Sequence, residues 1–153
     1  GIAQKGEFLA FSSVFGEKVH SYSSQAITDA EVCMIEKESL KNALLNNPEF
    51  ALRITSKNYR NERLLIEIIK NLSYKQMRGK LASALLYLSQ EEFINENIFE
   101  NLSRQEIADF ASISTESAIK FLKEFEKEGI IILNGKNIEI LHQEKLEQLS
   151  KNG

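Results

Sequence analysis

The chain has 153 residues, of which 42% are hydrophobic and 27% are charged, and its formal net charge is −3 at pH 7. This length and composition are typical of one or two small globular domains with a hydrophobic core. The sequence contains no run of about eighteen apolar residues and does not begin with a signal peptide, so neither a membrane span nor secretion is indicated, and we expect a cytoplasmic location.

Residues suited to metal binding or catalysis are few and far apart. Cys33 is the single cysteine, so it cannot form an internal disulfide, and His20 and His142 are the two histidines. We expect neither a metal nor a cofactor, and no catalytic activity, because no nucleophile, base and metal group come together in the sequence. Cys33 lies in an alternating apolar run and is interpreted as a buried strand residue.

Two helices are predicted early in the chain, a short one near Glu38 to Asn46 and a long one from Pro48 to Leu72. The second half of the long helix is apolar around most of its circumference, which favours more than one packing partner over a single amphipathic core helix. We expect a parallel homodimer. Its predicted interface consists of residues at near-heptad spacing: Ile54, Asn61, Leu65, Ile68 and Leu72.

A third helix is predicted from Lys75 to Ser89, because leucine and alanine recur there at helical spacing. The residues of this apolar face are Leu81, Ala84, Leu85 and Leu88. A connector follows from Asn95 to Asn101, with a short strand predicted at Ile98 and Phe99.

Two short helices separated by a tight turn are predicted between Ser103 and Lys127. Ser103 with Glu106 has the spacing of a capping box, and Ser114 is a second N-cap after a small break. This is the layout of a DNA-binding helix-turn-helix. Its helical apolar face comprises Ile107, Ala108, Phe110, Ile113, Ala118, Ile119, Leu122 and Phe125.

The segment after the second helix predicts a β-hairpin. Gly129 ends the helix, and two β-rich runs, residues 130–133 and 136–141, flank an Asn134-Gly135 turn. A hairpin at this point would make the unit a winged helix. A terminal helix is predicted from Gln143 to Ser150.

Four motifs of this region resemble the catabolite-activator (Crp/Fnr) family of bacterial transcription regulators in order and spacing. They are Leu-Ser-Arg-Gln-Glu-Ile-Ala from Leu102, Ser-Thr-Glu-Ser from Ser114, Glu-Gly-Ile-Ile from Glu128 and Asn-Gly-Lys from Asn134. The resemblance extends upstream, where Gly6-Glu7-Phe8 resembles the opening of the family's phosphate-binding cassette. Residues 28–35 resemble the closing strand of its β-roll.

The resemblance implies an α+β fold with three parts: the C-terminal part of a β-roll sensor domain (1–47), a dimerisation helix (48–72) and a winged helix DNA-binding domain (73–153). Broken β-roll strands are expected from Glu7 to Ile35. Fewer than fifty residues precede Pro48, which is too few for the family's complete roll, so we expect a piece of a longer protein. Residues 71–74 are the predicted hinge.

The resemblance also implies the partners: double-stranded DNA, a second copy of the chain and RNA polymerase. A dimer would hold two reading helices about 34 Å apart and bind a pseudo-palindromic operator. For Glu116 and Lys120 the alternative is a surface ion pair. The predicted DNA-binding residues are Ser114, Thr115, Glu116, Ser117 and Lys120 for bases, with Ser103, Arg104, Lys136, Lys75 and Arg78.

The sensor half resembles the family less closely. The effector pocket is predicted from Glu7, His20, Ser21 and Leu65. Glu7 matches the glutamate that contacts cyclic AMP in relatives, whereas His20, before Ser21, stands where they have arginine and Leu65 where they have threonine. We therefore expect no cyclic AMP binding, and either another small effector or none. The alternative function is a dimeric protein-interaction module without specific DNA binding, which the acidic winged-helix segment favours.

Overall fold

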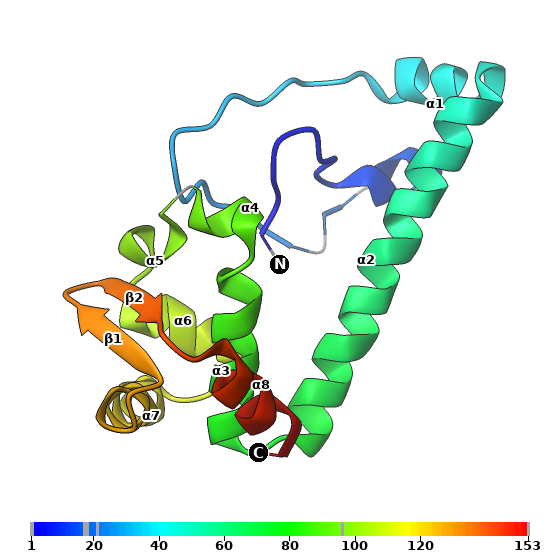
Figure 1. Cartoon of the computed structure of the whole chain (residues 1–153). Helices are drawn as coiled ribbons and strands as arrows, with labels where there is room; N and C mark the ends of the chain where they lie inside the picture. The colour runs from blue at the N-terminus through cyan, green and yellow to red at the C-terminus, as the bar shows by residue number, and fades with distance from the viewer. Residues whose placement is uncertain (1, 17–18, 21, 96, 153) are drawn as a thin grey trace. The chain divides into compact units, whose positions relative to one another are not determined.

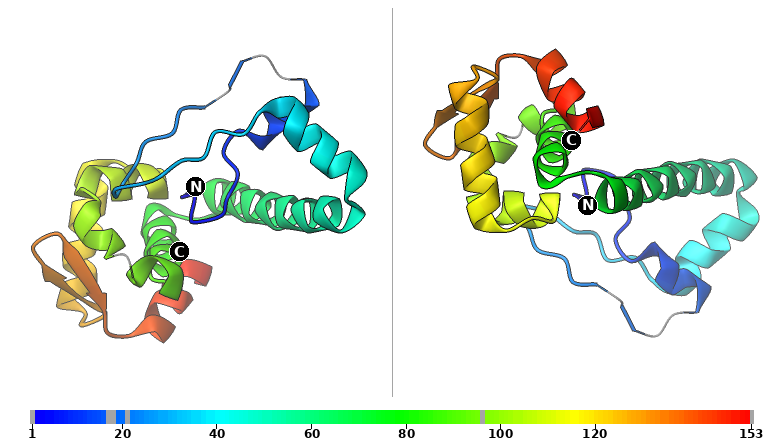
Figure 2. Two further views of the ribbon diagram at one scale, coloured as in Figure 1. Left: turned by 90° about the horizontal axis from the view of Figure 1, so that it is seen from above. Right: turned by 90° about the horizontal axis from the view of Figure 1, so that it is seen from below.

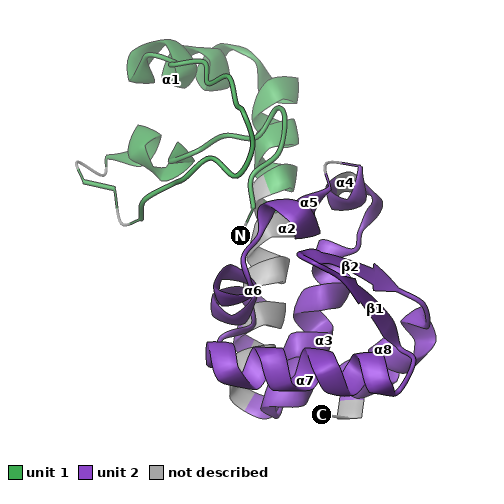
Figure 3. Ribbon diagram, turned by 90° about the vertical axis from the view of Figure 1, so that its left-hand side faces the viewer, with its two compact units in different colours: residues 1–63 green, residues 64–153 purple. Residues whose placement is uncertain are grey.

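The computed structural model divides the chain into two compact units, residues 1–63 and 64–153 (Figure 3). The described residues are 2–16, 19–20, 22–95 and 97–152, without the side chains of residues 58, 60–65, 67–68, 70–73, 92 and 152. The boundary between the units falls inside the long helix. The predicted three-part division at residues 47 and 72 stays a prediction.

Unit 1 contains a 3-10 helix, η1 (Phe11–Phe15), the helix α1 (Lys37–Asn46) and the start of α2 (Pro48–Tyr74). Proline at the first position of α2 suits a helix start, because its missing N–H has no intrahelical partner there. The Asn47 side chain accepts a hydrogen bond from the Phe50 N–H at 3.0 Å and so caps this start. Both helices predicted in this half of the chain are confirmed.

The strands predicted between Glu7 and Ile35 are absent from the described part of that segment, which forms η1, turns and unpaired chain. Its backbone hydrogen bonds are local, as between the Glu7 N–H and the Gln4 carbonyl at 3.0 Å. A strand needs a neighbour to satisfy its backbone groups, and these apolar runs meet no partner strand among the described residues. The strand prediction was wrong here, and Cys33, predicted to be buried, is exposed.

Unit 2 is built around α3 (Met77–Leu88), which packs against α6 (Arg104–Ala111), α7 (Thr115–Lys127) and α8 (Gln143–Asn152) (Figure 1). These four helices confirm the four helices that were predicted between residues 75 and 150. The break between α2 and α3 lies at residues 75–76, just after the predicted hinge, whose backbone is helical.

Two strands form the predicted hairpin, β1 (Ile131–Asn134) and β2 (Asn137–Ile140). They are antiparallel, with Ile131 opposite Ile140 and Leu133 opposite Ile138. In both views of Figure 2 the hairpin lies beside α7, and β1 contacts that helix. The predicted winged arrangement of two helices followed by a hairpin is therefore present.

Two short helices, α4 (Glu91–Ile94) and α5 (Ile98–Asn101), connect α3 to α6. The strand predicted at Ile98 and Phe99 was wrong. Both side chains are buried and α5 contacts β2, so this apolar pair packs against the hairpin without adding a strand to it.

The core of unit 2 draws on all of its larger elements. The fully buried large side chains are Phe125, Leu81, Leu85, Leu88, Ile107, Leu122, Ile131 and Leu146. Each removes apolar surface from water, which contributes about 1.5–3 kcal/mol for a leucine, isoleucine or phenylalanine. The predicted core face of α3 is confirmed. Among the described residues, no helix is both long and apolar enough to cross a membrane.

Replacing Phe125 with alanine should destabilise unit 2 by about 3–5 kcal/mol, because the fully buried ring leaves a cavity between α7 and α3. Phe121→Ala on the same helix should cost much less, because Phe121 is only partly buried. Urea unfolding followed by circular dichroism measures both. Equal losses would contradict the assignment of Phe125 to the centre of this core.

Candidate nucleic-acid interface

The first helix of the helix-turn-helix begins with the predicted capping box. The Ser103 hydroxyl accepts a hydrogen bond from the Glu106 N–H at 3.2 Å, and the Ser103 N–H donates to Glu106 Oε2 at 2.7 Å. The Ser103 N–H and hydroxyl, and then the charge of Lys136, lower the pKa of Glu106. Lys136 belongs to the hairpin turn, so the start of α6 and the hairpin tip interact electrostatically.

The turn between α6 and α7 is fixed by backbone hydrogen bonds. Ser112 has a φ of +55°, and its N–H donates to the Asp109 carbonyl at 3.1 Å while the Ile113 N–H donates to Ala108 at 3.0 Å. This is a Schellman motif, formed here without the usual glycine. Ser114 then caps α7 by accepting from the Ser117 N–H at 3.2 Å.

α7 has one buried face and one exposed face. Ala118, Leu122 and Phe125 are at most 1% exposed, and Figure 3 shows α7 crossing unit 2, with α6 before its start and the hairpin beyond its end. Ile119 was predicted to face inward and is instead 39% exposed. The exposed residues of α7 are Glu116, Ile119, Lys120, Lys123, Glu126 and Lys127.

The predicted base-reading residues lie together at the start of α7. Glu116 and Lys120 are exposed, and Thr115 and Ser117 are partly buried. Lys120 Nζ is 4.0 Å from Glu124 Oε1, so its ion pair is with the following turn and not with Glu116. An exposed ion pair of this kind contributes about 0.2–1 kcal/mol to stability. Breaking it so that Lys120 can contact another group therefore costs little free energy.

Arg104 connects α6 to the hairpin tip. Its Nη2 donates to the Gly135 carbonyl at 2.8 Å, and burial lowers the pKa of its guanidinium. Gly135 has a φ of +60° and, with Lys136, forms the two-residue turn, one residue later than the predicted Asn134-Gly135 pair. The side chain of Lys136 is exposed at this tip, whereas Arg104 is engaged within the unit.

Lys75 and Arg78, predicted to contact DNA phosphates, make contacts inside unit 2. Lys75 Nζ donates to the hydroxyls of Ser83 at 2.7 Å and Ser150 at 2.9 Å, which links α3 to α8. Arg78 Nη2 donates to both carboxylate oxygens of Glu128, at 2.5 and 2.6 Å, and its guanidinium carbon lies 5.3 Å from the Phe125 ring centroid. Both cations therefore stabilise the unit.

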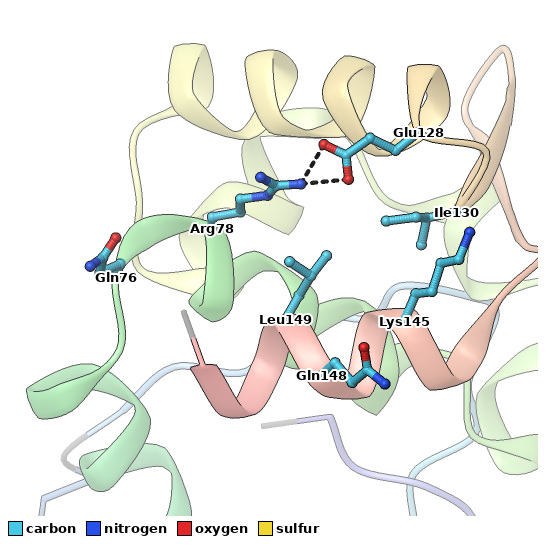
Figure 4. Close-up of a pocket in the computed structure, with 7 residues that line it drawn as sticks. All are labelled: Gln76, Arg78, Glu128, Ile130, Lys145, Gln148 and Leu149. Atoms are coloured by element: carbon cyan, nitrogen blue, oxygen red, sulfur yellow. Dashed lines mark hydrogen bonds and ion pairs between the residues drawn. The ribbon is translucent and has the colours of Figure 1, made fainter.

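An open groove of about 480 Å³ lies beside the Arg78–Glu128 pair (Figure 4). Gln148 and Leu149 of α8 form one side, and Ile130 and Lys145 lie near its other end. None of the lining residues belongs to the first turns of α7, so the groove is separate from the predicted base-reading residues.

The predicted effector and dimer residues lie largely outside the described residues. Ser21 and the side chains of Asn61, Leu65, Ile68 and Leu72 are not described. His20 is exposed, and Glu7 Oε1 is 3.4 Å from Lys57 Nζ. Ile54 is buried within unit 1, so it is not free to face a partner helix. In the described part of the chain, no three histidine, cysteine or acidic side chains form a cluster able to hold a metal ion.

Three further exposed residues of α7, Ile119, Lys123 and Lys127, were not predicted as site residues. The two lysines follow Lys120 at three and seven residues, a spacing that repeats one helix face and was available as a signal. Ile119 gave no such signal, because an isoleucine beside a core alanine is normally assigned to the core. Its exposure depends on how α7 is rotated against α3 and α6.

A family model described as a Crp-like helix-turn-helix domain matches residues 79–149. The chain is 26% identical over 138 residues to a cAMP-activated global transcriptional regulator of Salmonella typhimurium, covering 88% of this chain and 66% of that protein. It is also 26% identical over 152 residues to a fumarate and nitrate reduction regulatory protein of Vibrio cholerae, covering 95% and 59%.

Solved structures show the same fold. FixK2 from Bradyrhizobium japonicum matches with a TM-score of 0.61 at 18% identity, over 75% of this chain and 59% of that one. A CRP/FNR family transcriptional regulator from Thermus thermophilus matches with a TM-score of 0.59 at 22% identity, over 69% and 56%. The chain thus spans about two thirds or less of these relatives. Those relatives are named as regulators, in agreement with the prediction that the chain is not an enzyme.

Arg104→Ala should loosen the hairpin tip, because the hydrogen bond to the Gly135 carbonyl is lost. A net loss of about 1 kcal/mol corresponds to about fivefold faster amide exchange in the hairpin. Hydrogen–deuterium exchange of the peptide covering residues 131–140 measures this. Lys123→Ala, at an exposed position of α7 outside this peptide, is the control and should leave exchange unchanged; unchanged exchange in Arg104→Ala would contradict the anchoring role.

Glu106→Gln should make the stability of unit 2 less sensitive to acid. The folded-state pKa of Glu106 is lowered, so its charge contributes stability above the pKa of an unfolded glutamate, about 4.3. This contribution is lost as the pH falls through the lower, folded value. Urea unfolding from pH 7 down to about pH 3 tests the difference.

Ser103→Ala is the matched variant for this test. It removes the hydroxyl donor and keeps the backbone donor, which has the larger effect on the pKa of Glu106, so it should retain part of the acid sensitivity. If the free energy of unfolding falls with decreasing pH in the same way for Glu106→Gln as for the unchanged chain, the role of this charge is refuted.

Proposed function

The chain carries a Crp-like helix-turn-helix domain and belongs to the Crp/Fnr family, and from this premise we propose that it is a sequence-specific DNA-binding transcription regulator. The observation that carries the proposal is the exposed start of α7, which two serine caps and a Schellman turn hold in a fixed relation to α6. A helix presented in this way fits the major groove of B-DNA. A cytoplasmic location follows from this function in a bacterium.

Bases would be read by Glu116 and Lys120, one helical turn apart on the exposed face of α7. A glutamate accepts a hydrogen bond from the N4 amino group of cytosine, and a lysine donates to O6 and N7 of guanine. The weak contact of Lys120 with Glu124 leaves this lysine available. Thr115 and Ser117 offer hydroxyls at the same end of the helix for phosphate or base contacts.

Phosphates would be bound by the exposed lysines of α7 and the hairpin. Lys123 and Lys127 continue the face of Lys120, and Lys136 extends from the hairpin tip. The whole chain carries a net charge of −3, so the positive charge available for phosphates is confined to these lysines and their neighbourhood. We assign Ser103, Arg104, Lys75 and Arg78 to holding the unit together, since each donates a hydrogen bond within it.

Dimerisation would use the exposed apolar side chains of α2. Ile66 and Ile69, both in unit 2, are 48% and 61% exposed, an apolar surface that the helix leaves in water. A second copy of α2 would cover it, and two-fold symmetry would set two α7 helices about 34 Å apart. This geometry matches a pseudo-palindromic operator. RNA polymerase would be the further partner of such a regulator.

Control by a small effector is the second part of the proposal. Residues 1–47 are the part assigned to a sensor domain by the family resemblance, and one relative is named as cAMP-activated. In this chain Glu7 is paired with Lys57, and His20 replaces the arginine expected for a cyclic nucleotide phosphate. We therefore propose an effector other than cyclic AMP, bound near Glu7.

Selection from a random duplex DNA pool at two salt concentrations should recover a two-fold pseudo-palindrome with half-sites about one helical turn apart. Glu116→Ala and Lys120→Ala should each relax the preference at one position per half-site, by about 1–3 kcal/mol. Lys136→Ala should weaken binding to all DNA sequences by the same factor. It should also make binding less dependent on salt concentration, by the amount expected for the loss of about one phosphate contact.

Glu144→Ala is the control, since Glu144 is exposed on α8, outside α7 and the hairpin. It should leave the selected sequence unchanged. Recovery of no sequence above background, in the presence of a dimer, would refute the proposal and favour a protein-interaction module instead.

A further inference from the structure

The exposed face of α7 contains one apolar side chain among charged ones. Of the six exposed residues of this helix, whose residues are all described, Ile119 is apolar and the other five are Glu116, Lys120, Lys123, Glu126 and Lys127. The rest of the apolar strip of α7 is buried: Ala118 and Leu122 are at most 1% exposed, whereas Ile119 is 39% exposed. Core packing does not explain an isoleucine at this position.

The position of Ile119 is set by helix geometry. It follows Glu116 by three residues and Thr115 by four, so it lies on the same face, one turn further along the helix. Three residues correspond to a rise of about 4.5 Å, close to the 3.4 Å between successive bases of one strand. If Glu116 contacts one base pair, Ile119 lies beside the next.

The chemistry of Ile119 selects its partner in the groove. It has no hydrogen-bonding group, so it cannot read the donor and acceptor pattern of a base edge. The one apolar group that the major groove presents is the C5 methyl group of thymine. Isoleucine is also stiff at χ1 in a helix, so its methyl groups are held in place without further loss of side-chain freedom.

We propose that Ile119 is a specificity-determining residue that recognises the C5 methyl group of a thymine in each half-site. The inference rests on the proposed function, because it needs α7 in the major groove. Ile119 would add an apolar contact with DNA next to the hydrogen bonds made by Glu116 and Lys120. The half-site should therefore contain a thymine within one base step of the pair read by Glu116.

Replacing thymine with uracil in the selected operator tests the proposal. Uracil keeps every hydrogen-bonding group of thymine and lacks only the methyl group. For the unchanged full-length chain, the substitution should weaken binding about fourfold per half-site at one position, the value of one buried methyl group. For Ile119→Ala, the thymine and uracil operators should bind equally.

Two variants serve as controls. Ile119→Val keeps the branched methyl groups and should keep most of the thymine preference. Lys123→Ala, on the same face, should weaken the thymine and uracil operators by the same factor. Ile119 is 39% exposed and Lys123 is exposed, so cooperative thermal unfolding should confirm that these variants fold.

The outcomes separate this inference from the function on which it rests. Specific binding of the operator with no effect of uracil at any position overturns the role of Ile119 and leaves the regulator proposal standing. A uracil effect that persists in Ile119→Ala also overturns it, because another residue then reads the methyl group. Failure to select any operator overturns both.

Discussion

Ala118, Leu122 and Phe125 form one buried strip on α7, and the rotation of α7 that buries this strip determines which residues of the helix remain in water. Phe125 contacts the guanidinium of Arg78, which in turn pairs with Glu128 at the end of α7. The strip and this pair fix α7 against α3. The exposed face of Glu116, Ile119 and Lys120 is a consequence of that packing, since a helix that buries one side presents the opposite one.

Two turns of the same kind bound the reading helix. Ser112 follows α6, and Gly129 follows the C-cap of α7. In each case the N–H of this residue and the N–H of the next one donate back to the last turn of the helix, as in the Ile130 N–H to Phe125 carbonyl bond at 2.9 Å. Gly129 accepts the left-handed conformation readily, whereas Ser112 adopts it with a φ of +55° at some steric cost. The direction of the chain into and out of α7 is thus set by its backbone.

Much of unit 2 was predictable from sequence because its signals are local. Capping serines, helical spacing of Leu81, Leu85 and Leu88, and a glycine turn each specify one element without knowledge of the rest. The predictions that failed depend on distant partners. The apolar runs before Ile35 resemble strands, but a strand exists only with a neighbour, and the described residues supply none. Ile98 and Phe99 pack on β2 from outside its ladder.

The candidate site was likewise predictable where its signals are local and not where its residues contact distant partners. The first turns of α7 were identified from the Ser114 cap, but the partners of the cations were not, because Glu128, Gly135 and Ser150 are remote in sequence from Arg78, Arg104 and Lys75. These contacts distinguish cations that build the unit from cations that remain free for a ligand.

Arg104 binds the hairpin tip through the carbonyl oxygen of Gly135, a backbone group that every residue type possesses. The position of the tip is therefore insensitive to which side chains neighbour that carbonyl. Substitutions at Lys136 can add or remove charge while the tip stays where it is, and without altering the residues of α7. Overall attraction to a polyanion and discrimination among sequences can consequently evolve, or be engineered, one at a time.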